Sequence, residues 1–138
     1  MATSLSVSDL RRVPYPDPAT AQPAWLSLLR LSSLECRVAP RVSPSAACDL
    51  IDPSAGAEVY AEALARALPD LMTRRPVIWA PGAAGRSFDE DWLNACRNAL
   101  LRGDGDSFRF LTTRRLTRGS VPIFRMLLSG LGERLDKF

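Results

Sequence analysis

The sequence predicts an α+β fold that is mostly helical: a single compact domain of about four helices with a short two-stranded element. In several stretches, apolar residues recur at spacings of three and four, as in a helix with one buried face. Two short stretches, 76–80 and 107–112, instead have the composition or alternation of strands. Four prolines in the first 24 residues add a flexible proline-rich arm at 1–23, ahead of one globular domain at 24–138.

The first two helices are indicated by prolines that can open them. A helix is expected over 24–36, after Pro23, with Trp25 and Leu29 among its apolar positions. The second is expected to start at Asp52-Pro53, because an aspartate accepts from free amides and proline suits the first helical position. Pro69 should break or kink this helix.

The middle of the chain predicts a strand followed by a capped helix. Residues 76–80 indicate a short strand or a buried extended segment. Ser87 and Glu90 match a capping box, in which each side chain binds the other residue's backbone amide. A helix over 88–102 should follow, and Gly103 should end it in the left-handed conformation.

The last third predicts a turn, a strand and a helix. Asp104 to Asp106 should form the turn, and the strand over 107–112 follows from the alternation of Phe108, Phe110 and Thr112 with their neighbours. Ser120 can cap the final helix, in which Gly130 and Gly132 either fray the end or permit close packing.

Composition indicates a bacterial, cytoplasmic protein. Seventeen of the 18 basic residues are Arg, a bias typical of GC-rich coding. The three cysteines, Cys36, Cys48 and Cys96, are odd in number and have no metal-ligand spacing, which favours free thiols in a reducing compartment. The N-terminus has no apolar signal region, and no run of 18 apolar residues occurs, so neither export nor a membrane span is expected.

Catalytic and metal-binding patterns are weak, so we expect no enzyme activity, no cofactor and no metal. Histidine is absent, which removes the commonest general base and zinc ligand. Residues 80–87 resemble a phosphate loop only loosely, since Ala80 replaces the first glycine and Arg86 the lysine. Asp104 and Asp106 lack the glutamate that would complete a calcium loop, and a plain turn explains them better.

The most directional feature is an arginine-rich segment. Between Asp106 and Glu133 the chain has five positive charges and no negative one. An unpaired guanidinium cluster on an apolar scaffold generally faces an anionic or acidic partner. The alternative is that these arginines pair internally with Asp89 to Asp91 or with Glu58. The candidate partner-binding residues are Arg109, Arg114, Arg115, Arg118, Arg125 and, in the stiff Pro14-Tyr15-Pro16 part of the arm, Tyr15.

These observations favour a non-catalytic protein-interaction module: an adaptor, a chaperone-like partner or a structural subunit of a larger bacterial or phage assembly. Self-association through a strand edge is a further expectation. The second hypothesis is a nucleic-acid-binding accessory or regulatory protein that uses the Arg-rich segment 109–125, with Phe108 or Phe110 stacking on bases. The net charge of +3 is mild for that role.

Overall fold

The described part of the chain is helical. The computed structural model describes residues 22–36, 46, 49, 51–52 and 54–135. Its helices are α2 (Ala24–Cys36), α4 (Ala57–Leu71), α5 (Phe88–Arg102), α6 (Gly105–Thr113) and α7 (Val121–Leu135). The predicted fold class was therefore wrong: these residues contain five helices and no sheet, and their only β-type pairing is one antiparallel bridge between Met72 and Leu116.

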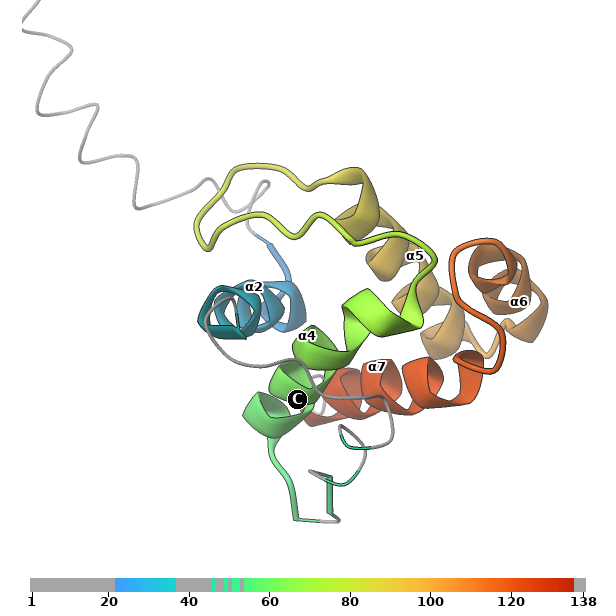
Figure 1. Cartoon of the computed structure of the whole chain (residues 1–138), viewed down its shortest axis with the longest axis horizontal. Helices are drawn as coiled ribbons and strands as arrows, with labels where there is room; N and C mark the ends of the chain where they lie inside the picture. Colours follow the sequence, from blue (N-terminus) through green and yellow to red (C-terminus); the bar gives the residue numbers. More distant parts are fainter. Residues whose placement is uncertain (1–21, 37–45, 47–48, 50, 53, 136–138) are drawn as a thin grey trace, which may run out of the picture.

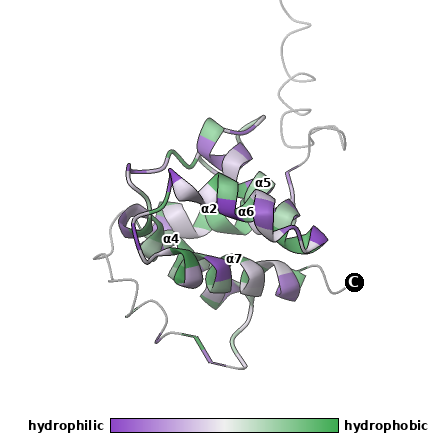
Figure 2. Ribbon diagram, turned by 90° about the vertical axis from the view of Figure 1, so that its right-hand side faces the viewer, coloured by the Kyte–Doolittle hydropathy of each residue, from purple (hydrophilic) through white to green (hydrophobic). Residues whose placement is uncertain are grey.

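Helix α4 lies at the centre of the packing. It packs against α2 on one side and α7 on the other, while α5 contacts α6 and α7. Figures 1 and 2 show α4 beside α7 in two perpendicular views. The buried apolar side chains of all five helices form one cluster, which includes Trp25, Leu64, Leu93, Phe108 and Phe124.

Two helices begin where the sequence predicts. Helix α2 follows Pro23, whose carbonyl accepts from the amides of the first turn. Helix α5 has the predicted capping box: the Ser87 side chain accepts from the Glu90 amide, and the Glu90 side chain accepts from the Ser87 amide. Gly103 ends α5 in the left-handed conformation, with a φ of 69°. All three confirmed helix ends depend on contacts within a few residues, which the sequence shows directly.

The predicted start of α4 was wrong. The helix begins at Ala57 with Gly56 as its N-cap, and not at Asp52-Pro53. Asp52 accepts instead from the amide and hydroxyl of Ser54 and so closes a separate turn before the helix. Pro53 lies outside the described residues. Pro69 does not end α4 at once, because the helix includes it and runs on to Leu71.

The predicted strand at 107–112 is helix α6. Asp104 accepts from the Ser107 amide and caps the helix, so the predicted turn residues form its first turn. Phe108 and Thr112 are buried, one helical turn apart, whereas Phe110 is 83% exposed. The alternation of Phe108, Phe110 and Thr112 was therefore misleading, because only the pair spaced by four residues faces the core.

Residues 76–80, predicted as a short strand or a buried extended segment, form an extended segment that has no partner strand among the described residues and is not buried, since Val77 and Trp79 are exposed. Two of its backbone amides bind carboxylates of α5: Val77 donates to Asp89 at 2.7 Å, and Trp79 donates to Glu90 at 2.9 Å. Side chains at the beginning of α5 thus take the place of a neighbouring strand. The predicted two-stranded element does not form among the described residues.

Helices α4 and α7 pack closely at a glycine. Gly130 is buried against the ring of Tyr60, and a Cβ atom at position 130 would overlap that ring. Of the two predicted roles for this glycine, close packing is the one observed. The guanidinium of Arg134 lies 4.0 Å from the centre of the same ring and donates to the Ala55 carbonyl at 2.6 Å.

Some predictions fall outside the described residues, including those for Tyr15, for Cys48 and for the arm up to residue 21. Ser120 immediately precedes α7, and its hydroxyl contacts that of Thr117. Among the helices that the structure describes, none has the length and apolar character that crossing a bilayer requires.

Candidate functional site

A short backbone pairing joins two arginine-bearing segments that are far apart in the sequence. The amide of Thr73 donates to the carbonyl of Arg115 at 2.9 Å, and the amide of Thr117 donates to the carbonyl of Leu71 at 2.7 Å. The pairing is antiparallel, with Met72 opposite Leu116. This isolated bridge brings the segment that continues to Arg74 and Arg75 beside the segment that contains Arg114 and Arg118.

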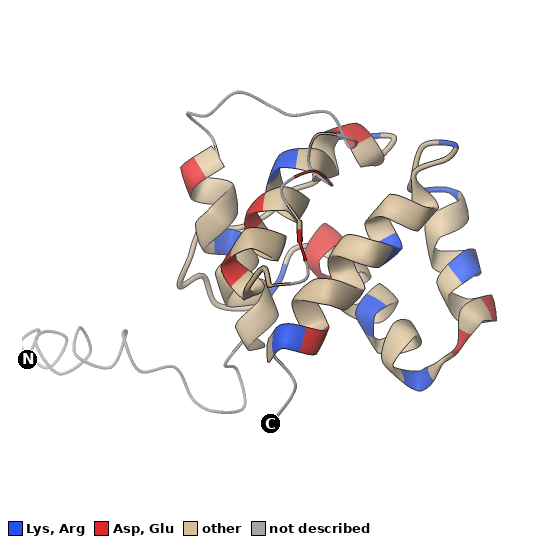
Figure 3. Cartoon of the chain, turned by 90° about the horizontal axis from the view of Figure 1, so that it is seen from below, with Lys and Arg blue, Asp and Glu red and all other residues tan. Residues whose placement is uncertain are grey.

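Four exposed arginines lie within two or three residues of the bridged positions, and we call them the arginine surface: Arg74, Arg75, Arg114 and Arg118. Within the described part of the chain, none of these four side chains forms an ion pair. Figure 3 shows the basic positions along the loop between α6 and α7. Sequence reasoning identified Arg114 and Arg118 but missed Arg74 and Arg75, because no local pattern links residues 71–73 to residues 115–117.

Arg115 differs from its neighbours because its side chain turns inward. It pairs with Asp89, one of the internal partners that the sequence analysis considered. Its guanidinium also lies over two rings of α5, 4.9 Å from the centre of Trp92 and 5.3 Å from that of Phe88. These contacts connect the loop after α6 to the start of α5, so Arg115 has a structural role.

The other predicted site residues lie on neighbouring helices. Arg109 is exposed on α6, one residue before the exposed Phe110. Arg125 is exposed on α7, and its guanidinium lies 5.8 Å from the centre of the buried Phe108 ring. Phe108 therefore belongs to the core, where it stacks with Phe124 at 6.1 Å, and of the two phenylalanines predicted to stack on bases Phe110 alone is exposed.

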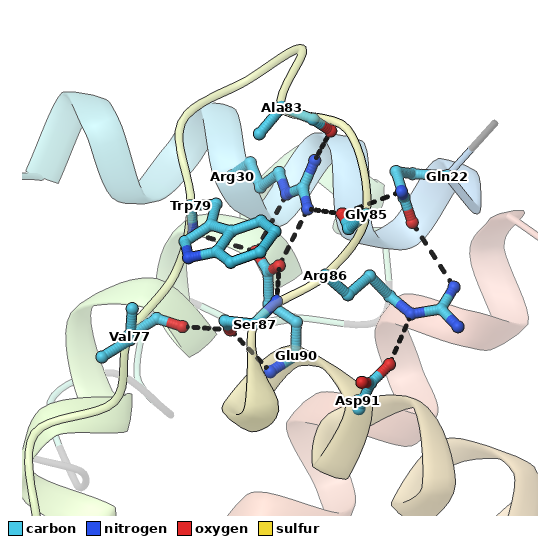
Figure 4. A network of polar contacts seen from close by, with 10 residues as sticks. All are labelled: Gln22, Arg30, Val77, Trp79, Ala83, Gly85, Arg86, Ser87, Glu90 and Asp91. Carbon is cyan, nitrogen blue, oxygen red and sulfur yellow. Dashed lines mark hydrogen bonds and ion pairs between the residues drawn. The ribbon is translucent and has the colours of Figure 1, made fainter. Parts of the chain in front are cut away.

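A second polar feature, the loop clamp, is a buried ion pair that fixes residues 76–87. Arg30 of α2 donates two hydrogen bonds to Glu90 of α5, at 2.9 and 2.8 Å, although both side chains are almost fully buried. The same guanidinium donates to the carbonyls of Ala83 and Gly85, at 3.0 and 2.8 Å. Figure 4 shows Arg30 reaching into the centre of the loop.

Further hydrogen bonds complete the loop clamp. The Ser87 hydroxyl donates to the Val77 carbonyl at 2.6 Å, and Gln22 donates to the Gly85 carbonyl at 2.9 Å. Arg86 pairs with Asp91 at 2.7 Å. These contacts reach residues 77 and 79 near the start of the loop and residues 83 and 85–87 near its end (Figure 4). The loop is therefore held on both sides of its exposed tip.

The Glu90 carboxylate stays ionised in this buried position. Burial by itself raises its pKa, but hydrogen bonds from Arg30, Ser87 and Trp79 together lower the pKa by more, so that it falls below the ordinary value for a glutamate. The negative charge of Glu90 is therefore a permanent part of the clamp at neutral pH.

The loop cannot hold a phosphate in the manner of a phosphate loop. Its interior contains the Glu90 carboxylate and the carbonyl oxygens of Ala83 and Gly85, all of which are hydrogen-bond acceptors. A phosphate site requires backbone amides and a cation that point inward. Here the one inward cation, Arg30, is already bound to these acceptors.

The described residues also offer little for metal binding or nucleophilic catalysis. No group of three or more metal-ligating side chains gathers among residues 22–36 and 54–135 or the few described between them. Cys96 is fully buried in α5, and this burial raises the pKa of its thiol to about 12, which keeps the thiol protonated. Cys36 at the end of α2 is also a free thiol.

No family model, no curated protein and no solved structure matches this chain.

Proposed function

We propose that this chain is a non-catalytic protein-interaction module, an adaptor or structural subunit, that binds an acidic segment of a partner protein through the arginine surface. One observation supports the proposal above all others. A bridge joins two segments about forty residues apart, and four exposed arginines lie within three residues of its paired positions, none with an ion pair within the described part of the chain.

These exposed charges form no ion pair that would hold the described part of the fold together. Like charges on neighbouring segments repel each other, and the fold does not use these guanidinium groups. Arg86 and Arg102 do have acidic partners, Asp91 and Asp104. The exposed Arg109 and Arg125 resemble the arginine surface, because they form no ion pair within the described residues. Arginine suits the proposed role, because its planar fork can donate two parallel hydrogen bonds to a carboxylate.

A second candidate function, binding of single-stranded nucleic acid, is favoured by one residue. Phe110 is 83% exposed on α6 and lies one helical turn before Arg114, an arrangement that permits base stacking beside a phosphate contact. However, the exposed Asp106 lies one turn before Phe110 on the same face, where its carboxylate repels phosphates. This acidic neighbour is the reason why we place the protein partner first.

The test compares two double variants of equal charge. Arg114→Gln with Arg118→Gln removes two unpaired arginines, and Arg86→Gln with Arg102→Gln removes two paired ones as a control. Binding is measured by fluorescence anisotropy with a labelled oligoglutamate peptide and a labelled oligothymidine of matched charge. We expect the first variant to weaken peptide binding about tenfold, and the control to change it little.

The outcomes separate the two functions. Tighter binding of oligothymidine than of the peptide, lost in Phe110→Ala and declining steeply with salt, would establish the nucleic-acid function instead. Equal effects of the two double variants on the peptide would show that binding follows net charge alone, and would remove the support for the arginine surface.

A further inference from the structure

The extended segment 76–80 has one satisfied edge and one open edge. In an extended chain, the amides and carbonyls of alternate residues point to the same side. Val77 and Trp79 direct their amides to Asp89 and Glu90, and the Val77 carbonyl accepts from Ser87, so this edge is bound to α5. Ile78, between them, directs its amide and carbonyl to the opposite edge.

On that opposite edge the Ala80 carbonyl accepts from the Ala83 amide, but the backbone groups of Ile78 have no partner among the described residues. Neither the amide nor the carbonyl of Ile78 forms a hydrogen bond there. The Ile78 side chain packs against the core, and the buried Glu90 holds the following amide. The segment is thus fixed in the extended conformation before any ligand arrives, which lowers the ordering cost of adding another strand.

The side chains around this edge are apolar and accessible. Val77 is 54% exposed and Trp79 38% exposed, and both lie on the face opposite to the Ile78 side chain. An added strand would therefore meet apolar side chains as well as main-chain groups.

We propose that the open edge at Ile78 takes up an extended segment of the partner protein as an added strand, with acidic residues of that segment reaching Arg74 and Arg75. This inference rests on the proposed function and deepens it, because it assigns the conformation of the bound partner. Charge complementarity decides the occupant: Arg74 and Arg75 are exposed directly before the edge and form no ion pair within the described residues.

A second copy of this chain fits the edge less well. If two copies paired in antiparallel fashion about Ile78, Arg75 would lie opposite Pro81 of the other copy, and Arg74 opposite Gly82. Neither position offers a carboxylate. The arginines would remain unpaired in such a dimer, whereas an acidic segment neutralises them.

The test uses the small number of isoleucines in the chain. Labelling with ¹⁵N-isoleucine gives amide signals for Ile51, Ile78 and Ile123 alone. The probe is a synthetic peptide in which valine and threonine alternate before three acidic residues, together with the same peptide in reversed order. Bound peptide should slow the solvent exchange of the Ile78 amide and shift its signal, and leave Ile51 and Ile123 unchanged. Binding of either peptide without a response at Ile78 overturns the inference, as does failure of both peptides to bind.

Two variants test the edge independently. Ile78→Pro removes the amide donor but suits an extended backbone, and Ile78→Ala is its matched control because it loses the side chain and keeps the amide. We expect Ile78→Pro to bind the probe peptide about tenfold more weakly than Ile78→Ala, as the loss of an ordinary hydrogen bond implies. Should Ile78→Pro not fold, the exchange of the Ile78 amide in the wild-type chain decides the question.

The arginines separate this inference from the proposed function. The double variant Arg74→Gln with Arg75→Gln should bind the acidic peptide more weakly than the wild type does. A control peptide, in which glutamines replace the acidic residues, should bind weakly and equally to the variant and to the wild type. If this variant loses binding while Ile78→Pro and Ile78→Ala bind the peptide equally, the proposal of an acidic partner stands and strand addition is refuted. Unchanged binding in all these variants contradicts both proposals.

Discussion

Arg30 and Arg114 show how two environments give the same side chain opposite roles. Arg30 is 2% exposed and directs its donors to Glu90, Ala83 and Gly85, so the domain depends on it. Arg114 is exposed at the end of α6 and has no ion pair among the described residues. A buried charge must be matched within the fold, whereas an exposed charge can be left for a partner. Arg115, paired and partly buried, lies between these extremes.

The largest effect should come from breaking the loop clamp. Arg30→Met leaves the Glu90 carboxylate buried without its cation, and we expect a loss of about 3–5 kcal/mol in the free energy of unfolding, measured in urea. Adding Glu90→Gln should restore part of this loss, because the neutral amide keeps an oxygen for the amides of Ser87 and Trp79. A loss below about 1 kcal/mol would mean that Arg30 is not essential to the clamp.

The same ion pair should make stability depend on pH. Because the pKa of Glu90 is lower in the folded chain, its contribution is complete above the ordinary glutamate pKa and is lost as the pH falls through the folded-state pKa. Denaturation at a series of acidic pH values should therefore show a steeper decline for the wild type than for Glu90→Gln. Parallel curves for the two proteins would contradict the assignment.

Removal of the cap tests the other end of the clamp. Ser87→Ala removes the acceptor for the Glu90 amide and the donor to the Val77 carbonyl, and should cost about 1–2 kcal/mol by thermal or urea unfolding. Ser87→Thr, which keeps the hydroxyl, is the control. Equal stability of Ser87→Ala and the wild type would be inconsistent with the capping box.

Substitution of Arg115 should reduce stability by less than substitution of Arg30 and by more than substitution of Arg114. Arg115→Gln loses the ion pair with Asp89 and the contacts over Trp92 and Phe88, and we expect a loss of about 1 kcal/mol. Arg114→Gln, one residue earlier, is the matched control. If the two variants unfold at the same denaturant concentration, Arg115 does not differ from the exposed arginines.

The smallest effect on stability should come from the arginine surface itself. Arg114→Gln with Arg118→Gln should change the free energy of unfolding by no more than about 0.5 kcal/mol, since neither side chain has a partner in the described part of the chain. Unfolding of this variant under native conditions would show that these residues hold the domain together, and would remove the basis for a binding surface.

The sequence by itself predicted the features that depend on near neighbours. Ser87 and Glu90 are three residues apart, so their reciprocal hydrogen bonds were readable as a pattern. Gly103 is adjacent to the helix that it ends, and Pro23 to the one that it opens. The same local reasoning failed at 107–112, because alternation and helical spacing both fit a short run of apolar residues, and only the core decided that Phe110 points outward.

The tertiary structure decided the features that join distant residues. Arg30 and Glu90 are 60 residues apart, and Thr73 and Arg115 are 42 apart, so no spacing in the sequence indicates either contact. The packing of α2, α4 and α5 decides which segments lie beside each arginine. It therefore decides whether that arginine belongs to the loop clamp or remains an exposed surface charge. Residue type fixed the charge of Arg30 and of Arg114, but burial and the distance to a carboxylate, which only the folded chain defines, determined what each charge does.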